Sequence, residues 1–230
     1  MEKEEKQFNV LLQILKQFHS AGILQDMMLI GSWCLYFYRR EYEGVTALPA
    51  IRTLDVDFLI PHHRHLRKDA DIPSLLKEMG FVSTFNRSSG LVVYDHEDLR
   101  VEFLIPELGR GHQKPQEVKA LGVKALALRY LNLLTEHPRI VIYQGLHIKV
   151  PEPAVFALHK LIISARRVNK EKARRDLEMA VGVLEFLYKK PGEIKRIKSI
   201  LRAIPRKWLQ TLLSVSDKHF PQLNETAGDF

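Results

Sequence analysis

The stretch RTLDVDFLI, residues 52–60, carries Asp55 and Asp57 in an otherwise largely apolar segment. Side chains alternate between the two faces of a β-strand, so this spacing predicts both carboxylates on one face. Leu54, Val56 and Phe58 then point to the other face, toward a core. Two neighbouring acids repel each other, and burying either is costly unless a cation compensates. The alternative is a strand edge whose acids reach water or pair with a nearby arginine.

A third acid lies in LRVEFLI, residues 99–105, which also reads as a strand. Val101 and Phe103 share one face there, and Glu102 lies on the opposite face. On a strand next to the D-x-D strand, Glu102 completes a set of hard oxygen ligands of the kind that Mg²⁺ prefers, and Mg²⁺ suits phosphate chemistry. Taken singly, Glu102 is better explained as an exposed residue of a two-faced sheet.

A Gly-Ser pair, Gly31-Ser32, ends the apolar run MMLIGSW at residues 27–33. A glycine at the junction of a strand and a helix lets a phosphate approach the backbone. Ser32 is expected to cap the next helix, over about residues 32–42, whose N–H groups favour anions. Many helices begin with serine, so the pair gains meaning only from its order ahead of the D-x-D and the later acid.

Composition limits the protein class and its surroundings. The 230 residues include one cysteine, Cys34, which excludes an internal disulfide and favours a reducing, cytoplasmic setting. No apolar stretch approaches the ~20 residues that a membrane-spanning helix needs, so no membrane partner is expected. The net charge is +8, and residues 160–207 hold 15 Lys/Arg against 5 Asp/Glu. That excess fits a polyanionic ligand, although a solvated helical surface has the same composition.

The hydrophobic pattern predicts an α+β fold with two domains, residues 1–150 and a basic helical domain at 151–230. Apolar residues from Phe8 to Phe18 recur at helical spacing, and Gly22 is expected to end that helix. Strands are expected at 27–30, 54–60, 81–85, 91–94 and 99–105, a hairpin at 140–143 and 146–150, and helices at 71–79, 123–134 and throughout the second domain. The tail after Asp217 is expected to be loose.

The ordered set of Gly31-Ser32, Asp55/Asp57 and Glu102 resembles the nucleotidyltransferase superfamily, which has the DNA-polymerase-beta-like fold. A later segment is similar to the helical half of prokaryotic nucleotidyltransferase-domain proteins of poorly assigned function. Its residues are AVFALHKLIISARR at 154–167 and KARRDLEMA at 172–180. Together the two resemblances cover most of residues 24–188. One departure is Trp33, where the family commonly has a small or flexible residue, and its bulk is expected to narrow the site.

The resemblance implies a nucleotidyltransferase-like mixed sheet flanked by helices and followed by a helical region. It also implies an enzyme that moves an NMP from an NTP substrate to a hydroxyl, with Mg²⁺ or Mn²⁺ in a two-metal mechanism. Asp55, Asp57 and Glu102 would be catalytic and metal-binding. The nucleotide-binding residues would be Gly31, Ser32, Lys160, Arg167 and Arg175. Asp176 would orient one of these cations, or serve as an ordinary ion-pair partner on a helix surface.

The acceptor stays open between a protein side chain, an RNA end and a small molecule. Two other classes of protein fit the same sequence. One is a catalytically silent relative that binds a nucleotide or a partner, such as a toxin–antitoxin component. The other is a basic RNA-binding module whose acids are incidental and whose affinity falls with salt.

Overall fold

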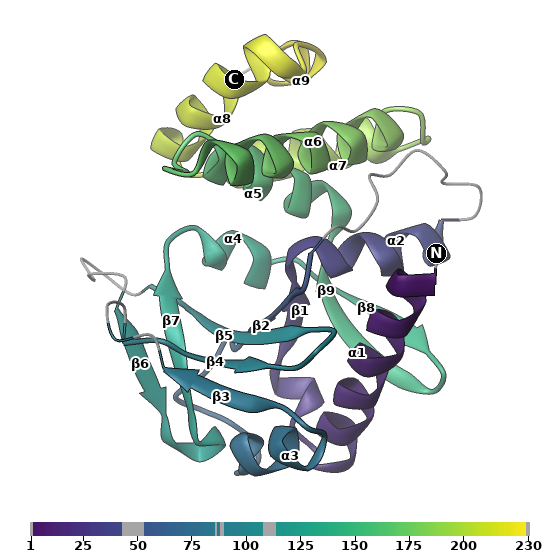
Figure 1. Ribbon diagram of the computed structural model, residues 1–230. Helices are drawn as coiled ribbons and strands as arrows, with labels where there is room; N and C mark the ends of the chain where they lie inside the picture. The colour runs from purple at the N-terminus through teal and green to yellow at the C-terminus, as the bar shows by residue number, and fades with distance from the viewer. Residues whose placement is uncertain (1, 43–52, 86, 88–89, 108–113, 229–230) are drawn as a thin grey trace. The chain divides into compact units, whose positions relative to one another are not determined.

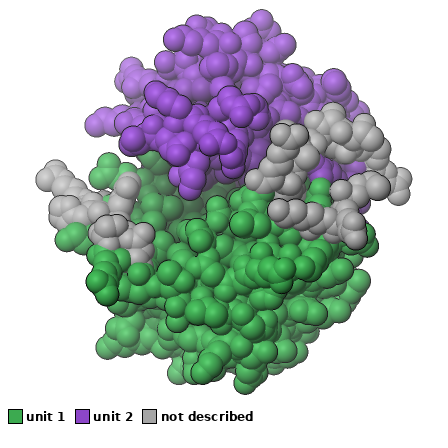
Figure 2. All heavy atoms as spheres, viewed as in Figure 1, with its two compact units in different colours: residues 1–37, 51–151 green, residues 38–50, 152–230 purple. Residues whose placement is uncertain are grey.

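The computed structural model describes residues 2–42, 53–85, 87, 90–107 and 114–228. The chain divides into two compact units (Figure 2): residues 1–37 with 51–151, and residues 38–50 with 152–230. The described residues 38–42 thus group with the C-terminal unit, whereas a linear division at residue 150 leaves them with the N-terminal one. Each unit is described by itself.

The first unit is built on a seven-stranded mixed sheet (Figure 1). The strand order is β1-β2-β5-β4-β3, and β7 pairs with both β5 and β6. The β2–β5 and β5–β7 pairs are parallel, and the others are antiparallel. The strands are β1 (Met28–Ile30), β2 (Asp55–Leu59), β3 (Val82–Phe85), β4 (Val92–Asp95), β5 (Arg100–Pro106), β6 (Pro115–Val118) and β7 (Val123–Leu128). The predicted α+β class with a mixed sheet is confirmed.

Aromatic packing builds the core on one face of this sheet. Helix α1 (Glu2–Ser20) buries the stripe that the sequence predicted, and Gly22 follows it with φ +74°. The Phe18 ring lies 5.2 Å from Phe58 of β2 and 6.4 Å from Phe103 of β5, measured between centroids. The alternate residues of β2 and β5 therefore lie on the opposite face.

Short elements complete the first unit. The hairpin of β8 (Pro138–Tyr143) and β9 (Leu146–Pro151) turns at Gln144 and Gly145, both with positive φ. Helix α3 (Ile72–Glu78) is capped by Asp71, whose carboxylate accepts from Ser74 N at 3.2 Å. The rest are α2 (Cys34–Glu41), which crosses the boundary between the units, α4 (Leu131–Thr135), η1 (Leu24–Asp26), η2 (Gly31–Trp33) and η3 (Lys119–Leu121).

The helix predicted over residues 123–134 is wrong. Residues 123–128 form strand β7, and only Leu131–Thr135 is helical. Alanine and leucine favour helices in isolation, but tertiary pairing overrides that preference here. Val123, Ala125 and Ala127 are buried in alternation, and β7 hydrogen-bonds to strands on both sides.

The second unit contains five described helices, which confirms the predicted C-terminal helical region. They are α5 (Pro153–Ser164), α6 (Lys170–Leu187), α7 (Glu193–Ala203), α8 (Arg206–His219) and α9 (Gln222–Ala227). Ten successive residues of α5, Pro153–Ile162, are buried, so this helix is central to the unit. Across the described parts of the chain, no helix combines the length and apolar character needed to cross a membrane.

The expectation of a loose tail after Asp217 is also wrong. Helix α8 continues to His219, and α9 follows it with Leu223 and Ala227 buried. Tyr188 Oη and Thr226 Oγ1 lie 2.7 Å apart in a hydrogen bond that joins α9 to the end of α6. Few apolar residues mark this tail in the sequence, and the fold supplies the surface that buries them.

Leu223→Ala tests whether α9 is part of the folded unit. The leucine side chain is fully buried, so its truncation is expected to lower the free energy of unfolding by about 2–4 kcal/mol. Glu225→Ala, an exposed change in the same helix, should stay within about 0.5 kcal/mol. Urea unfolding followed by far-UV circular dichroism measures both, and equal small effects would contradict the packing of α9.

Candidate functional site

The three predicted acids lie on the same face of the sheet. In the parallel β2–β5 pair, Asp57 is opposite Glu102, and Asp55 is opposite Arg100. Each acid is half-buried, whereas Val56 and Phe58 are fully buried on the opposite face. The prediction that Leu54 shares this core is wrong, because it precedes the first residue of β2 and is 47% exposed. Residues opposite each other on neighbouring strands are about 4.8 Å apart, and alternate residues on one strand are about 6.6 Å apart. The backbone thus places all three carboxylates within reach of one another.

Gly31 is adjacent to Asp57 and is required to be glycine for two reasons. Strand β1 pairs with β2 so that Ile30 lies opposite Asp57, and the chain turns at Gly31 with φ +76°. A Cβ atom at residue 31 would lie 2.4 Å from Asp57 Oδ2, closer than any real contact. An L side chain is therefore disfavoured by the backbone conformation, and it would require the Asp57 carboxylate to move. The Gly-Ser junction and the D-x-D thus meet in space.

The helix that follows Gly31 begins later than predicted. Residues Gly31–Trp33 form a 3-10 turn, and α2 begins at Cys34 without a side-chain cap from Ser32. Ser32 is half-buried. The Trp33 side chain is fully buried, and its ring centroid lies 6.4 Å from that of Tyr36. The expected narrowing of the site by Trp33 is therefore wrong, because the indole belongs to the core.

Arg100 is a charged residue of this face that the sequence interpretation missed. Its Nε donates to Asp95 Oδ1 at 2.6 Å, and Asp95 lies opposite it in the antiparallel β4–β5 pair. The hydrogen bond to Asp95 raises the pKa of the Arg100 guanidinium, and the charges of Asp55 and Glu102 act in the same direction. The R-x-E spacing with Glu102 is the sequence signal that was available.

The acids fit a divalent cation in kind and in backbone placement. Carboxylate oxygens are hard ligands, and Asp57 and Glu102 present two of them from directly opposed positions. Asp55 accepts from Thr53 Oγ1 at 3.5 Å. Within the described ranges, no three acidic, histidine or cysteine side chains are gathered closely enough to form a metal site as they stand. The strand register nevertheless puts all three on one face, with Asp57 directly opposite Glu102.

The predicted cations of the second unit meet at a buried carboxylate. Lys160 Nζ of α5 donates to Asp176 Oδ1 at 2.6 Å, and Arg167 Nε donates to Asp176 Oδ2 at 2.8 Å. Asp176 is 3% exposed and Lys160 is 7% exposed, so the interpretation of Asp176 as a helix-surface ion-pair partner is wrong. Burial by itself would raise the pKa of Asp176, but Lys160 and Arg167 outweigh it and lower that pKa. The three side chains together carry one net positive charge.

Arg175, the third predicted cation, has a different partner. It pairs with Glu171 one turn earlier on α6, and both side chains are largely exposed. An exposed pair at this spacing contributes about 0.3–0.5 kcal/mol. Lys160 and Arg167 therefore share the Asp176 carboxylate, whereas Arg175 belongs to a separate surface pair.

His159 is a buried neighbour of this ion cluster. Burial lowers the pKa of His159 to about 3, and the charge of Lys160 contributes in the same direction. The Nε2 atom of His159 is buried without a hydrogen-bond partner. The imidazole is consequently neutral at pH 7.

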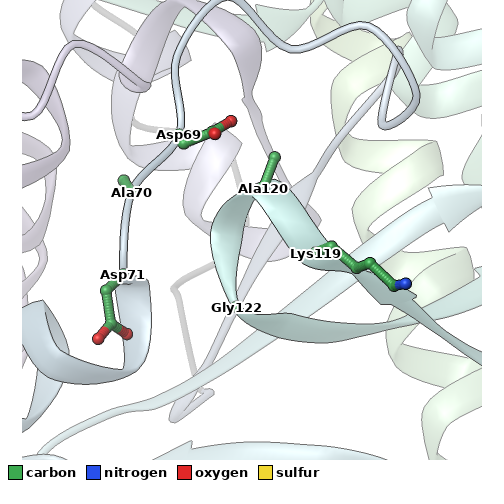
Figure 3. Close-up of a pocket in the computed structure, with 6 residues that line it drawn as sticks. All are labelled: Asp69, Ala70, Asp71, Lys119, Ala120 and Gly122. Carbon is green, nitrogen blue, oxygen red and sulfur yellow. The ribbon is translucent and has the colours of Figure 1, made fainter.

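A surface pocket of about 550 Å³ lies elsewhere on the first unit (Figure 3). The residues that line it are Asp69, Ala70, Asp71, Lys119, Ala120 and Gly122. None of these is a predicted site residue. The Asp71 carboxylate serves as the cap of α3, so the pocket offers little chemistry of its own.

Comparison with protein families gives a match over most of the chain. A family model described as "Nucleotidyltransferase" matches residues 9–204, a range that includes every predicted site residue. Among curated proteins, none matches the chain by sequence.

Two solved structures show a looser likeness. An antigenic nucleotidyltransferase-like protein from Paracoccidioides brasiliensis is 17% identical with a TM-score of 0.49, over 95% of this chain and 89% of that one. The antibiotic-resistance factor ANT(2'')-Ia is 9% identical with a TM-score of 0.41, over 98% of this chain and 99% of that one. Both TM-scores are below 0.5, and the family of the chain is established by the sequence match over residues 9–204.

Gly31→Ala tests the contact between the glycine and Asp57. Positive φ costs an alanine about 1–2 kcal/mol, and the overlap with Asp57 is expected to add about 1–3 kcal/mol. Gly145→Ala is the matched control, because Gly145 has φ +80° and open space around a Cβ. Urea unfolding of both variants separates the two terms, and equal losses would show that the Asp57 contact does not constrain residue 31.

His159 should make stability depend on pH. The folded pKa is about 3 and the unfolded pKa is about 6.5, so only the unfolded chain takes up this proton between those values. Stability is therefore lost as pH falls through this window, by at most about 1.4 kcal/mol per pH unit for one proton. His159→Gln should reduce the slope of unfolding free energy against pH between about 6.5 and 4.

The exposed His219 provides the control for that measurement. His219→Gln also removes one imidazole and serves as the reference against which the His159→Gln slope is compared. A slope that is the same in the His159→Gln variant and in the wild type would contradict a neutral, buried His159.

Proposed function

The chain belongs to the nucleotidyltransferase family, whose model matches residues 9–204, and from that membership we propose that it transfers a nucleoside monophosphate from an NTP to a hydroxyl acceptor. The observation that supports the proposal is the position of Asp57. It lies against Gly31 on one side and opposite Glu102 on the other. A carboxylate pair beside a glycine turn suits a triphosphate held by cations.

Each part of the chain would have a defined task. Asp55, Asp57 and Glu102 would hold Mg²⁺ or Mn²⁺, two ions in the family's mechanism. When bound, such ions act as Lewis acids at the phosphate and the acceptor oxygen. Gly31 would keep a side chain out of the turn beside Asp57, and the Ser32 hydroxyl would donate to a phosphate oxygen. Glu102 would accept the proton of the acceptor hydroxyl.

The proposed transfer forms one phosphorus–oxygen bond and breaks another. The acceptor oxygen attacks the α-phosphorus, the bond from that phosphorus to the bridging oxygen breaks, and pyrophosphate leaves with its electron pair.

Lys160, Arg167 and Arg175 are proposed to bind phosphate oxygens. Asp176 favours this for Arg167, because it fixes a guanidinium that stays 40% exposed. Lys160 has weaker support, because it is buried in its ion pair with the same carboxylate. The pairing of Arg175 with Glu171 gives it weaker support.

Transfer of a labelled nucleotide tests the proposal. Each α-labelled NTP is incubated with the protein and Mg²⁺ or Mn²⁺, with and without cell extract, and label is sought in protein, RNA and small-molecule fractions. Asp55→Asn/Asp57→Asn should lower incorporation by about 100-fold or more, because metal-assisted charge stabilisation is worth several kcal/mol. The fraction that takes up label would identify the acceptor class.

The matched control is Asp69→Asn/Asp71→Asn, a D-x-D in the surface pocket that loses the same two charges. Asparagine caps a helix as well as aspartate does, so α3 should be retained. Equal labelling by wild type and the Asp55/Asp57 variant would refute the transferase. NTP binding without labelling would favour the silent relative, and salt-sensitive RNA binding unaffected by Asp55→Asn would favour the RNA-binding module.

A further inference from the structure

Three charged residues form a row across neighbouring strands of the first unit. Asp55 of β2 lies opposite Arg100 of β5, and Arg100 lies opposite Asp95 of β4. Asp57 and Glu102 occupy the next row on the same face, two residues further along β2 and β5. Arg100 is therefore flanked by a carboxylate on each neighbouring strand.

The guanidinium of Arg100 is bound to Asp95, the carboxylate on the β4 side of this row. Its Nε contacts Asp95 Oδ1 at 2.6 Å, and the two side chains are 47% and 32% exposed. The charges of Asp55 and Glu102 also act on it. Neighbouring strands are about 4.8 Å apart, so the backbone positions of Asp95 and Asp55 lie at similar distances on either side of Arg100.

We propose that Asp95 is a positioning residue that holds Arg100 away from Asp55 and Glu102 and so sets the affinity of these carboxylates for a divalent cation. The inference rests on the proposed function, which assigns the cation to Asp55, Asp57 and Glu102. Arginine keeps its charge at all relevant pH values, so it competes for the same oxygens whenever it is within reach. Asp95 provides the alternative partner that limits this competition.

Two single substitutions have opposite expected effects. Asp95→Asn leaves Arg100 without its carboxylate partner, so the guanidinium should move toward Asp55 and Glu102 and weaken cation binding. Arg100→Gln removes the competitor and should strengthen it. The expected changes in dissociation constant are about three- to tenfold, as befits one partly exposed charge at short range. Asp95→Glu keeps the charge and should stay near the wild type.

The double variant Asp95→Asn/Arg100→Gln separates positioning from simple charge. If Asp95 acts through Arg100, Asp95→Asn should weaken binding in the wild-type background but change it less than about twofold when Arg100 is glutamine. A carboxylate that merely adds negative potential would have the same effect in both backgrounds.

The measurement is titration of the full chain with Mn²⁺, with unbound Mn²⁺ read by electron paramagnetic resonance. Arg67→Gln is the control for loss of one cation from the same unit, since Arg67 contacts Gln25 and Asp26 before β1. Circular dichroism confirms that each variant is folded.

The variant Asp55→Asn/Asp57→Asn distinguishes failure of the proposed cation site from failure of the positioning role of Asp95. If this variant binds Mn²⁺ as the wild type does, both the proposed site and the role of Asp95 are overturned. If it loses binding while the Asp95 and Arg100 variants differ no more than Arg67→Gln does, only the positioning role fails. Opposite shifts in the two single variants that are non-additive in the double variant would support it.

Discussion

The parallel pairing of β2 with β5 is the constraint on which the candidate site depends. It puts Asp57 directly opposite Glu102, and the β1–β2 pairing places Gly31 against the same carboxylate. The register is maintained by the core on the opposite face of the sheet, where the rings of Phe58 and Phe103 pack on Phe18 of α1. A slip by one residue would bury the acids and expose these phenylalanines, so the core and the site specify one arrangement.

Charge is distributed differently in the two units. On the sheet, several carboxylates share one face with a single arginine, and Asp95 holds that arginine. In the helical unit, two cations surround one buried carboxylate beside a neutral histidine. Buried ion clusters of this kind often contribute less to stability than apolar residues of the same size would.

Much of the fold follows from local patterns in the sequence. The helix from Phe8 to Phe18, the hairpin around Gln144-Gly145 and the D-x-D strand were all predicted by periodicity and turn residues. The errors lie where partners distant in the chain decide the outcome. Strand β7 has a helix-favouring composition but is fixed by β5 and β6, and α9 is fixed by its packing around Leu223.

The sequence alone determined which residues share a face, because alternation along a strand is a local property: Asp55 with Asp57, and Arg100 with Glu102. Only the tertiary structure decided that these two pairs stand opposite each other, that Gly31 contacts Asp57, and that Arg100 binds Asp95. It likewise decided that Asp176 is buried between Lys160 and Arg167. Strand order and register depend on how apolar side chains far apart in the chain pack together, and no local spacing contains that information.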